Sequence, residues 1–316
     1  MKQDFKVLLT GGAGFIGSHI AERLLSDGCH VIVLDNLYTG KLRNLKRCLG
    51  NPNFRFIKGD IRDKKTVGKA IIGVDAVMHQ AAITSVPFSI KNPKLTYDVN
   101  VAATTNLLKS CVKNDVARFI FASSSAVYGA AKKMPISENT PTGPLSPYGE
   151  YKLRIEKYCQ KLWKECKLET VCLRYFNVYG PRQTDGQYAV VISGFFDRLK
   201  NRLPPIIYGD GEQTRDFIYV SDVVEANILA LDREKAAGKI LNIGTGKATS
   251  INQLSRTFMK LMRRSGVKPK YMAPRAGDIR HSQADIIKAK KILGYKPRIS
   301  LEQGLKKFIE WKFSEK

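Results

Sequence analysis

The chain has 316 residues, of which 43% are hydrophobic and 26% charged, a composition typical of a globular protein. This length is sufficient for a large core and, we expect, for two lobes. No apolar run approaches the roughly 18 residues that a membrane span needs. Residues 1–12 lead directly into a strand, without the apolar core of a signal peptide, so we expect a cytoplasmic protein that binds no membrane.

The formal net charge of +25 is compatible with nucleic-acid binding, with an anionic small substrate, or with the surface of a heat-adapted protein. The basic residues are scattered, never three in a row, and no basic segment alternates with aromatic residues. We therefore favour a solvated basic surface over nucleic-acid binding. The cysteines form no C-x-x-C motif and the histidines lack ligand spacing, so we expect neither a disulfide framework nor a metal site.

Strand-like and helix-like segments alternate through the first half of the chain. Helical patterns around Ile16–Leu24, Val67–Ile71, Val101–Val112 and after Tyr148 separate most of the short apolar runs. This alternation predicts an α/β fold with a Rossmann-type doubly wound parallel sheet. The runs of strand length are Phe5–Leu9, Val31–Asp35, Phe54–Lys58, Ala76–His79, Phe119–Ala122 and Thr170–Tyr175.

The pattern becomes irregular after about residue 177, where Gly and Pro cluster and helices dominate near the end. We predict a first domain over residues 1–177, with a return segment near 215–243. The remainder, 178–316, is expected to form a smaller, mixed and discontinuous lobe over the carboxyl ends of the strands.

A glycine-rich loop follows the first predicted strand and opens a helix. Gly11, Gly14 and Gly17 permit a tight turn, a close approach to a pyrophosphate and close helix–strand packing. Asp35 ends the second strand, 18 residues after the last glycine, where a carboxylate would bind ribose hydroxyls and repel a 2′-phosphate. NAD is therefore predicted rather than NADP. Asp60, after the third strand, is a candidate adenine contact, although a plain turn explains it equally well.

Tyr148 and Lys152 lie four residues apart in the stretch SPYGEYKL, which starts at Ser146. If this stretch opens a helix, both side chains lie on one face and Tyr151 points elsewhere. A nearby ammonium favours the phenolate of a tyrosine, whose pKa is ordinarily about 10. The pair therefore suits proton transfer, although an ordinary amphipathic helix has the same spacing.

Ten motifs, spread in order over nearly the whole chain, resemble the extended short-chain dehydrogenase/reductases. Within that family, they are most similar to the nucleotide-sugar 4-epimerases of the UDP-galactose 4-epimerase type. The motifs are GGAGFIGSH (11–19), LDNL (34–37), HQAA (79–82), NV (100–101), SSSAVYG (123–129), SPYGEYK (146–152), LRYFNVYGPR (173–182), TRDFIYVSD (214–222), NIGTG (242–246) and RAGDIRHS (275–282).

The resemblance implies an NAD-binding first domain and a UDP-sugar-binding lobe. It also implies a tightly held NAD that is reduced and reoxidised within each turnover, through a transient 4-keto sugar. A homodimer is expected, with a four-helix interface built from the two long helices near Asn100–Val112 and Pro147–Cys166.

The resemblance also assigns the catalytic groups. Tyr148 is the expected base, and Lys152 is expected to lower the pKa of Tyr148 and to bind the nicotinamide ribose. Ser124, four residues before Tyr128, corresponds to the hydroxyl that shares a hydrogen bond with the sugar oxygen. No acidic residue follows Ser124, because Ser125 and Ala126 stand there, which disfavours 4,6-dehydratase or decarboxylase chemistry.

Binding residues are carried over from the same motifs. Ser123 is expected to be structural or to contact the cofactor, and Ser125 to face the sugar. Arg215 and Arg275 match phosphate-binding arginines. The expected NAD contacts are Gly11, Gly14, Phe15, Ile16, Gly17, Asp35, Asn36, Asp60, Ile61, Ala81, Ala82, Asn100, Ser123, Tyr148, Lys152 and Tyr175. The expected UDP-sugar contacts are Thr84, Ser85, Ser125, Asn177, Arg215, Arg275, Asp278 and Ser282.

Ser282 bears on the choice of sugar. Epimerases restricted to glucose and galactose have a bulky tyrosine at the matching position, so a serine would leave room for an N-acetyl group. We predict activity on UDP-N-acetylglucosamine and UDP-N-acetylgalactosamine, alone or beside the plain hexoses. One alternative is a UDP-glucuronate 4-epimerase, which should need a further cation near carbon 6. The other, a non-catalytic NAD- or RNA-binding protein, is disfavoured because Ser124, Tyr148 and Lys152 are all present.

Overall fold

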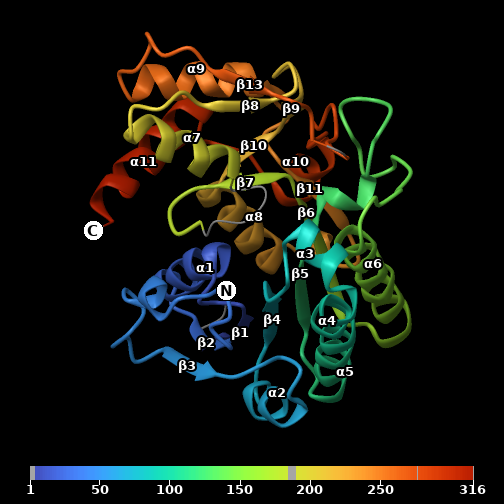
Figure 1. Ribbon diagram of the computed structural model, residues 1–316. Helices are drawn as coiled ribbons and strands as arrows, with labels where there is room; N and C mark the ends of the chain where they lie inside the picture. Colours follow the sequence, from blue (N-terminus) through green and yellow to red (C-terminus); the bar gives the residue numbers. More distant parts are fainter. Residues whose placement is uncertain (1–3, 184–189, 276, 316) are drawn as a thin grey trace.

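The computed structural model describes residues 4–183, 190–275 and 277–315, and its centre is a sheet of seven parallel strands (Figure 1). The six strands predicted from the first half of the chain are confirmed, with small differences at their ends. The seventh, β11, comes from the later half and pairs with β6 at the edge of the sheet. In spatial order the strands are β11 (Ile240–Ile243), β6 (Glu169–Tyr175), β5 (Arg118–Ser124), β4 (Ala76–His79), β1 (Lys6–Thr10), β2 (His30–Asp35) and β3 (Phe54–Lys58).

Successive side chains of a strand point to opposite faces of the sheet, and both faces are buried under helices. In β1, Val7 and Leu9 belong to one core cluster and Leu8 to the other. The first cluster includes apolar residues of α1 (Phe15–Ser26) and α8 (Val220–Asp232). The second includes those of α2 (Lys64–Ala70), α5 (Thr104–Lys113) and α6 (Pro147–Cys166). The predicted doubly wound α/β architecture is therefore confirmed.

The segment predicted as a helix near Asn100–Val112 is divided. Two short helices, α3 (Val86–Lys91) and α4 (Pro93–Tyr97), are followed by the π-helical turn η2 (Asp98–Ala103), and only then by α5. The side chain of Asn100 lies in η2 and makes two hydrogen bonds of 2.8 Å to the backbone of Ile83. These bonds tie η2 to the loop that follows β4. π-turns of this kind occur frequently at functional sites.

The later part of the chain forms short strand pairs and helices, drawn together at the top of Figure 1 over one end of the central sheet. The pairs are β7 (Asn177–Tyr179) with β10 (Phe217–Tyr219), β8 (Ile206–Tyr208) with β13 (Lys270–Met272), and β9 (Thr214–Arg215) with β12 (Thr249–Ser250). The helices are α7 (Val190–Lys200), α9 (Ile251–Leu261), α10 (Ile287–Leu293) and α11 (Leu301–Ser314), and the 3₁₀ turns of the chain are η1 (Leu42–Leu45), η3 (Ser125–Tyr128) and η4 (Glu234–Ala236).

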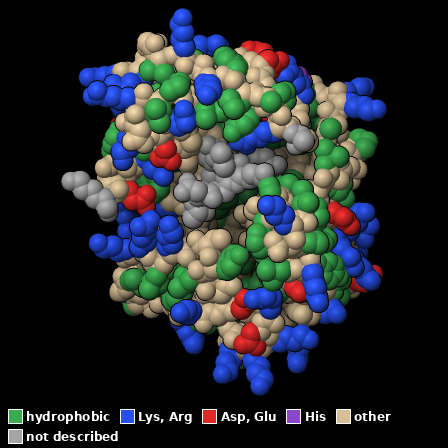
Figure 2. Space-filling model, in the orientation of Figure 1, with side chains coloured by type: hydrophobic (Ala, Val, Ile, Leu, Met, Phe, Trp, Pro, Cys, Tyr) green, Lys and Arg blue, Asp and Glu red, His purple; other side chains and the backbone are tan. Residues whose placement is uncertain are grey.

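The surface in Figure 2 has Lys and Arg side chains around its whole outline, and they form no continuous stripe on this face. Among residues 4–183, 190–275 and 277–315, no helix combines the length and the apolar character that a bilayer crossing requires. In the same residues, no three His, Cys, Asp or Glu side chains are grouped as metal ligands would be.

Candidate functional site

A cavity of about 280 Å³ lies at the carboxyl ends of β1, β4, β5 and β6 and is bounded by the later part of the chain. Open α/β sheets bind their ligands at this edge. We refer to it as the main cavity. The residues predicted from the sequence that line it are Gly11, Gly14, Phe15, Ile16, Gly17, Thr84, Ser85, Ser123, Ser124, Ser125, Tyr148, Lys152, Tyr175, Asn177, Arg215 and Ser282.

A smaller cavity of about 110 Å³ shares Gly11 with the main cavity and extends towards β2 and β3. We refer to it as the side cavity. The predicted residues that line it are Gly11, Asp35, Asn36, Asp60, Ile61, Ala81 and Ala82. The glycine loop thus lies between two cavities. This arrangement is the one expected if each half of a dinucleotide occupies one of the cavities.

The glycine loop has the geometry that a pyrophosphate needs. Gly11 has a positive φ of 69°, and a Cβ atom on Gly17 would overlap the carbonyl oxygen of Gly11. Helix α1 begins at Phe15, and none of the described side chains caps its amino end. The first amide groups of α1 are therefore available to an anion beside the loop. These residues fit NAD.

Gly17→Ala tests this close approach. We expect the purified variant to contain less than about a tenth of the NAD of the wild type, and its melting temperature to fall, because the added methyl pushes α1 away from the loop. Cofactor content is read from the absorbance of the denatured supernatant, and stability by calorimetry. Gly68→Ala is the matched control, since Gly68 lies inside α2 with no atom within 4 Å of the added Cβ. An unchanged NAD content in Gly17→Ala would contradict this function of the loop.

Asp35 is held by the backbone of the neighbouring loops. Its Oδ2 accepts a hydrogen bond from the Ala13 amide (2.9 Å), and its Oδ1 accepts one from the Leu37 amide (2.8 Å). Burial raises the pKa of its carboxyl, and the backbone hydrogen bonds oppose this shift. The side chain is fixed at the wall of the side cavity, in position to accept ribose hydroxyls.

Asp60 forms a second fixed carboxylate in the side cavity. Arg62 donates to both of its oxygens at 2.9 Å, and Asn36 Nδ2 donates to Oδ2 at 2.8 Å. The hydrogen bonds from Arg62 lower the pKa of Asp60 to about 2. Arg62 also lines the side cavity and was not predicted, although it lies two positions after Asp60.

Helix α6 presents the tyrosine–lysine pair to the main cavity. The Ser146 side chain caps this helix by accepting a hydrogen bond from the Gly149 amide (3.2 Å), and Pro147 is its first residue. The Lys152 Nζ atom lies 5.8 Å from the centre of the Tyr148 ring. Tyr151 points elsewhere, as predicted, with its hydroxyl near the Pro93 carbonyl oxygen.

Lys152 is buried, and its Nζ donates a hydrogen bond of 2.6 Å to the carbonyl oxygen of Ala122. Burial lowers the pKa of Lys152 to about 8, so the ammonium form still predominates at neutral pH. Tyr148 is 8% exposed and borders the same cavity. The arrangement places a cationic donor beside a phenol at the end of β5.

The serine triplet follows β5 into the cavity. Ser124 Oγ accepts a hydrogen bond of 3.2 Å from the amide of Ala126, and Ser125 begins the turn η3. Ser123 is turned away from solvent and donates to Glu156 Oε1 at 2.5 Å. All three serines line the main cavity, with Ser124 and Ser125 more exposed than Ser123.

Tyr175 and Gln80 form the floor of the main cavity between β4 and β6. The Tyr175 hydroxyl lies 2.9 Å from Asn227 Oδ1 and accepts from Gln80 Nε2 at 3.2 Å. Burial raises the pKa of Tyr175 to about 12, so it remains a neutral phenol. Gln80 was not predicted, although it directly follows β4 and the carboxyl-end rule would have found it. Other lining residues that were not predicted include Phe176, Val178, Gln183 and Ile279 in the main cavity, and Tyr38 in the side cavity.

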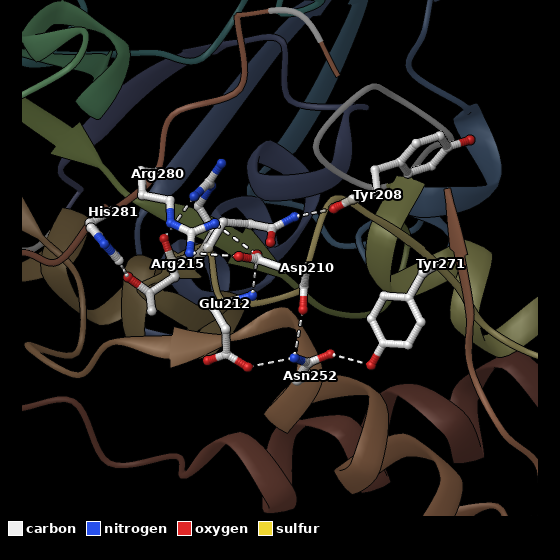
Figure 3. Close-up of polar contacts among 10 residues, drawn as sticks. Tyr208, Asp210, Glu212, Arg215, Asn252, Tyr271, Arg280 and His281 are labelled. Carbon is white, nitrogen blue, oxygen red and sulfur yellow. Dashed lines mark hydrogen bonds and ion pairs between the residues drawn. The ribbon is translucent and has the colours of Figure 1, made fainter. Parts of the chain in front are cut away.

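Arg215 lies at the outer rim of the main cavity. Its guanidinium pairs with Asp278 at 2.5 Å and also donates to the Thr214 carbonyl oxygen at 2.7 Å. Figure 3 shows Arg215 beside a polar cluster in which Arg280 clamps both oxygens of Asp210. The rim is thus a charged edge formed by segments that are far apart in the sequence.

Three predicted binding residues are not among the residues that line either cavity. Asn100 lies behind the wall of the side cavity and holds Ile83. Asp278 is the partner of Arg215. Arg275 is exposed, with its guanidinium carbon 3.9 Å from the centre of the Tyr208 ring.

Comparison with known proteins agrees with this geometry. The chain is 44% identical over 309 residues to a putative UDP-glucose 4-epimerase of Methanocaldococcus jannaschii, covering 96% of this chain and 97% of the relative. Its structure resembles that of a UDP-N-acetylglucosamine 4-epimerase from Methanobrevibacter ruminantium in complex with UDP-N-acetylmuramic acid (TM-score 0.94, 38% identity, 100% of both chains). It also resembles the UDP-glucose 4-epimerase of Thermotoga maritima with UDP-glucose (TM-score 0.91, 39% identity, 98% of this chain and 99% of the other).

The fold and the site define an NAD-dependent enzyme of the short-chain dehydrogenase/reductase class. The family profile described as "NAD dependent epimerase/dehydratase family" matches residues 7–244, and the chain belongs to that family. The predictions of an isomerase and of NAD as its cofactor are thereby confirmed.

Proposed function

We propose that this protein interconverts the C4 epimers of UDP-sugars and that N-acetylated hexoses are among its substrates. The observation that carries the proposal is the main cavity, where the tyrosine–lysine pair and Ser124 form one wall beside the glycine loop. Asn177, Arg215 and Ser282, from the later part of the chain, line the same cavity. A nucleotide-sugar in this cavity would have its reacting carbon beside both the base and the cofactor.

In this function Tyr148 removes the proton of the sugar 4-hydroxyl and later returns it. Lys152, beside the ring, stabilises the phenolate and donates to the nicotinamide ribose. Ser124 holds the same sugar oxygen by a hydrogen bond. NAD, when bound, supplies the reversible oxidation at carbon 4. The residues proposed to hold it are the glycine loop, Asp35, Asn36, Asp60 and the loop 81–83, which Asn100 supports.

The proposed diphosphate contacts lie at the rim. Arg215 is directed to that region by its bonds to Asp278 and Thr214, and a guanidinium fork suits phosphate oxygens. Asn177 lies beside it at the start of β7. We propose Arg275 as a second phosphate ligand and Asp278 as a contact to the uridine ribose. Both would have to turn inward from their positions at the edge.

Ser282 supports the N-acetyl proposal. It is 8% exposed, lines the main cavity, and its amide donates to the Thr214 carbonyl oxygen at 3.1 Å. A small side chain on a fixed backbone leaves the adjacent space to the substrate. Thr84 and Ser85, on the wall beside α3, are proposed as further contacts to the sugar.

Two alternatives have less support. A uronate 4-epimerase should present an additional cation to carbon 6, whereas the cations among the described lining residues of the main cavity are Lys152 and Arg215, both already engaged. A non-catalytic NAD- or RNA-binding protein would have no need of the complete Ser124, Tyr148 and Lys152 set.

A panel of four UDP-sugars tests the proposal. We expect the purified protein to convert UDP-galactose and UDP-N-acetylgalactosamine into their epimers, UDP-N-acetylglucosamine in the reverse direction, and UDP-glucuronate at a rate at least about 100-fold lower. Products are separated by anion-exchange chromatography. Conversion of UDP-galactose without any conversion of the N-acetylated sugars would refute the assignment of the sugar. No conversion of any of the four would refute the function.

Three further expectations remain proposals. The NAD-binding domain comprises residues 1–177 with a return segment near 215–243, and the UDP-sugar lobe comprises 178–316. A homodimer forms through a four-helix interface built from the segments near Asn100–Val112 and Pro147–Cys166. A cytoplasmic location likewise stays a prediction.

A further inference from the structure

A buried ion pair lies directly behind the candidate site and has no role in the proposed chemistry. Glu156 is 0% exposed, and its two oxygens accept hydrogen bonds from Arg174 Nε (2.8 Å) and Arg174 Nη2 (2.6 Å). A carboxylate without access to water is costly unless charged partners compensate it. Replacing such a pair by apolar residues often costs nothing, so the burial of this pair calls for another explanation.

Glu156 also accepts a hydrogen bond from Ser123 Oγ at 2.5 Å. Ser123 lies in β5 between Ala122, whose carbonyl oxygen accepts from Lys152, and Ser124. The carboxylate therefore anchors the middle residue of a three-residue segment that contacts the lysine at one end and carries the proposed catalytic hydroxyl at the other.

Helix geometry brings Glu156 close to the same lysine. Tyr148, Lys152 and Glu156 follow one another at intervals of four residues on α6, so their side chains share one face. Glu156 opposes the effect that burial has on Lys152, because a nearby anion favours the ammonium form.

We propose that Glu156 is a positioning residue that provides the counter-charge for the Lys152 ammonium and fixes the end of β5 through Ser123. This inference rests on the proposed function, in which that lysine must be charged. Behind the groups that would contact NAD and sugar, the site then includes a carboxylate that keeps Lys152 charged and the end of β5 in place.

The other ionisable groups around Lys152 stay in one charge state near neutral pH. His79, on β4, is buried between Thr10 and Thr104, and burial lowers its pKa to about 3. Cys172, on β6, is a thiol whose hydrogen bond with Cys159 and burial raise its pKa well above the ordinary value. Tyr148 also faces the lysine, whose Nζ lies 5.8 Å from the centre of its ring.

The ionisable surroundings of Glu156 are equally simple. Arg174 stays charged, and its guanidinium carbon lies 4.7 Å from the centre of the Tyr128 ring. Burial raises the pKa of Tyr128 to about 12. Lys288, on α10, also senses Arg174, and burial lowers its pKa. A change in the titration of Lys152 after mutation of Glu156 therefore reports on the carboxylate.

Glu156→Gln is the test, because it removes the charge and keeps the shape. We expect the pKa of Lys152 to fall by roughly one unit from about 8, since the lysine stays buried and loses the anion that favours its charged form. This pKa is measured by NMR on protein with ¹³Cε-labelled lysine, the Lys152 signal being assigned by its absence in Lys152→Arg. In kinetics, the basic limb of the kcat/KM profile should move to lower pH by the same amount, with kcat lowered and KM little changed. Glu156→Asp, which keeps the charge, should restore part of the shift.

Glu169→Gln is the matched control. Glu169, on β6, also pairs with an arginine, Arg118 on β5. This pair lies at the opposite end of the two strands from Ser123 and Arg174, and the Glu169 side chain is 37% exposed. It should leave the Lys152 titration and the pH profile unchanged. A folded Glu156→Gln protein with the wild-type Lys152 pKa would overturn the proposal, as would an equal shift in the control.

Folding of the single variant is not essential to the test. If Glu156→Gln does not fold, the double variant Glu156→Gln/Arg174→Met removes both buried charges. It should again show a Lys152 pKa below the wild-type value, and an unchanged pKa would overturn the proposal. The NMR titration needs no substrate. A protein inactive on every UDP-sugar but with the expected shift would therefore contradict the proposed function alone.

Discussion

Tyr148→Phe is expected to lower kcat for the epimerisation of UDP-galactose by about 10³-fold or more, equivalent to about 4 kcal/mol of transition-state stabilisation. The change removes one oxygen atom and retains the ring, which is 8% exposed and packed at the start of α6. The backbone amide of residue 148, which donates to Ser89 Oγ at 3.3 Å, is unaffected. The loss should therefore reflect the missing proton acceptor.

Two measurements separate chemistry from structure in this variant. The NAD content and the melting temperature should remain close to those of the wild type, because the glycine loop and the core are untouched. Tyr151→Phe is the control, since Tyr151 lies on the same helix but its hydroxyl lies near Pro93 at 3.4 Å, away from the cavity. If Tyr148→Phe retained more than about a tenth of the wild-type rate, Tyr148 would not be the base.

Ser282→Tyr is expected to change the choice of sugar. A tyrosine at this position would fill space in a cavity of about 280 Å³, on a backbone held by the hydrogen bond to Thr214. Conversion of UDP-N-acetylgalactosamine should fall by about 100-fold or more, because the tyrosine ring would occupy the space that the proposal gives to the N-acetyl group. Conversion of UDP-galactose should change by less than about fivefold, since its smaller 2-hydroxyl still fits.

The ratio of kcat/KM for the two substrates measures this effect. Ser282→Ala is the control, because it removes the hydroxyl and keeps the space, and it should process both substrates like the wild type. A Ser282→Tyr protein that lost both activities equally would mean that the tyrosine distorts the lobe. One that kept both would mean that Ser282 does not contact the sugar.

The sequence and the structure agree where the argument depends on local chemistry. The glycine loop, the six first-half strands and the Tyr148–Lys152 spacing follow from side-chain size, from apolar periodicity and from helix geometry, all of which act within a few residues. The segment before Thr104 departs from this agreement. Its π-helical turn is stabilised by Asn100, whose partners on Ile83 lie 17 residues away.

The candidate site shows the same division. Gln80 and Arg62 were not predicted, although their sequence neighbours were. Each follows the carboxyl end of a strand of the central sheet, and this position would have been enough to predict both. The spacing places Glu156 on the same face of α6 as Tyr148 and Lys152, but nothing in the sequence around it shows that its carboxylate is buried. Its partners Ser123 and Arg174 come from two different strands.

By itself, the sequence determined the class of fold and the cofactor, and it led to the proposal that Tyr148 and Lys152 transfer the proton. The glycine loop and the spacing of this pair involve residues that are close in the chain, and the strands follow one repeating pattern. Tertiary structure alone decided which side chains share a cavity, which arginines pair with a carboxylate, and where a buried charge lies. Those properties depend on distances between segments that only the folded chain brings together. In the low dielectric of the interior, these distances determine the charge state and the orientation of ionisable side chains.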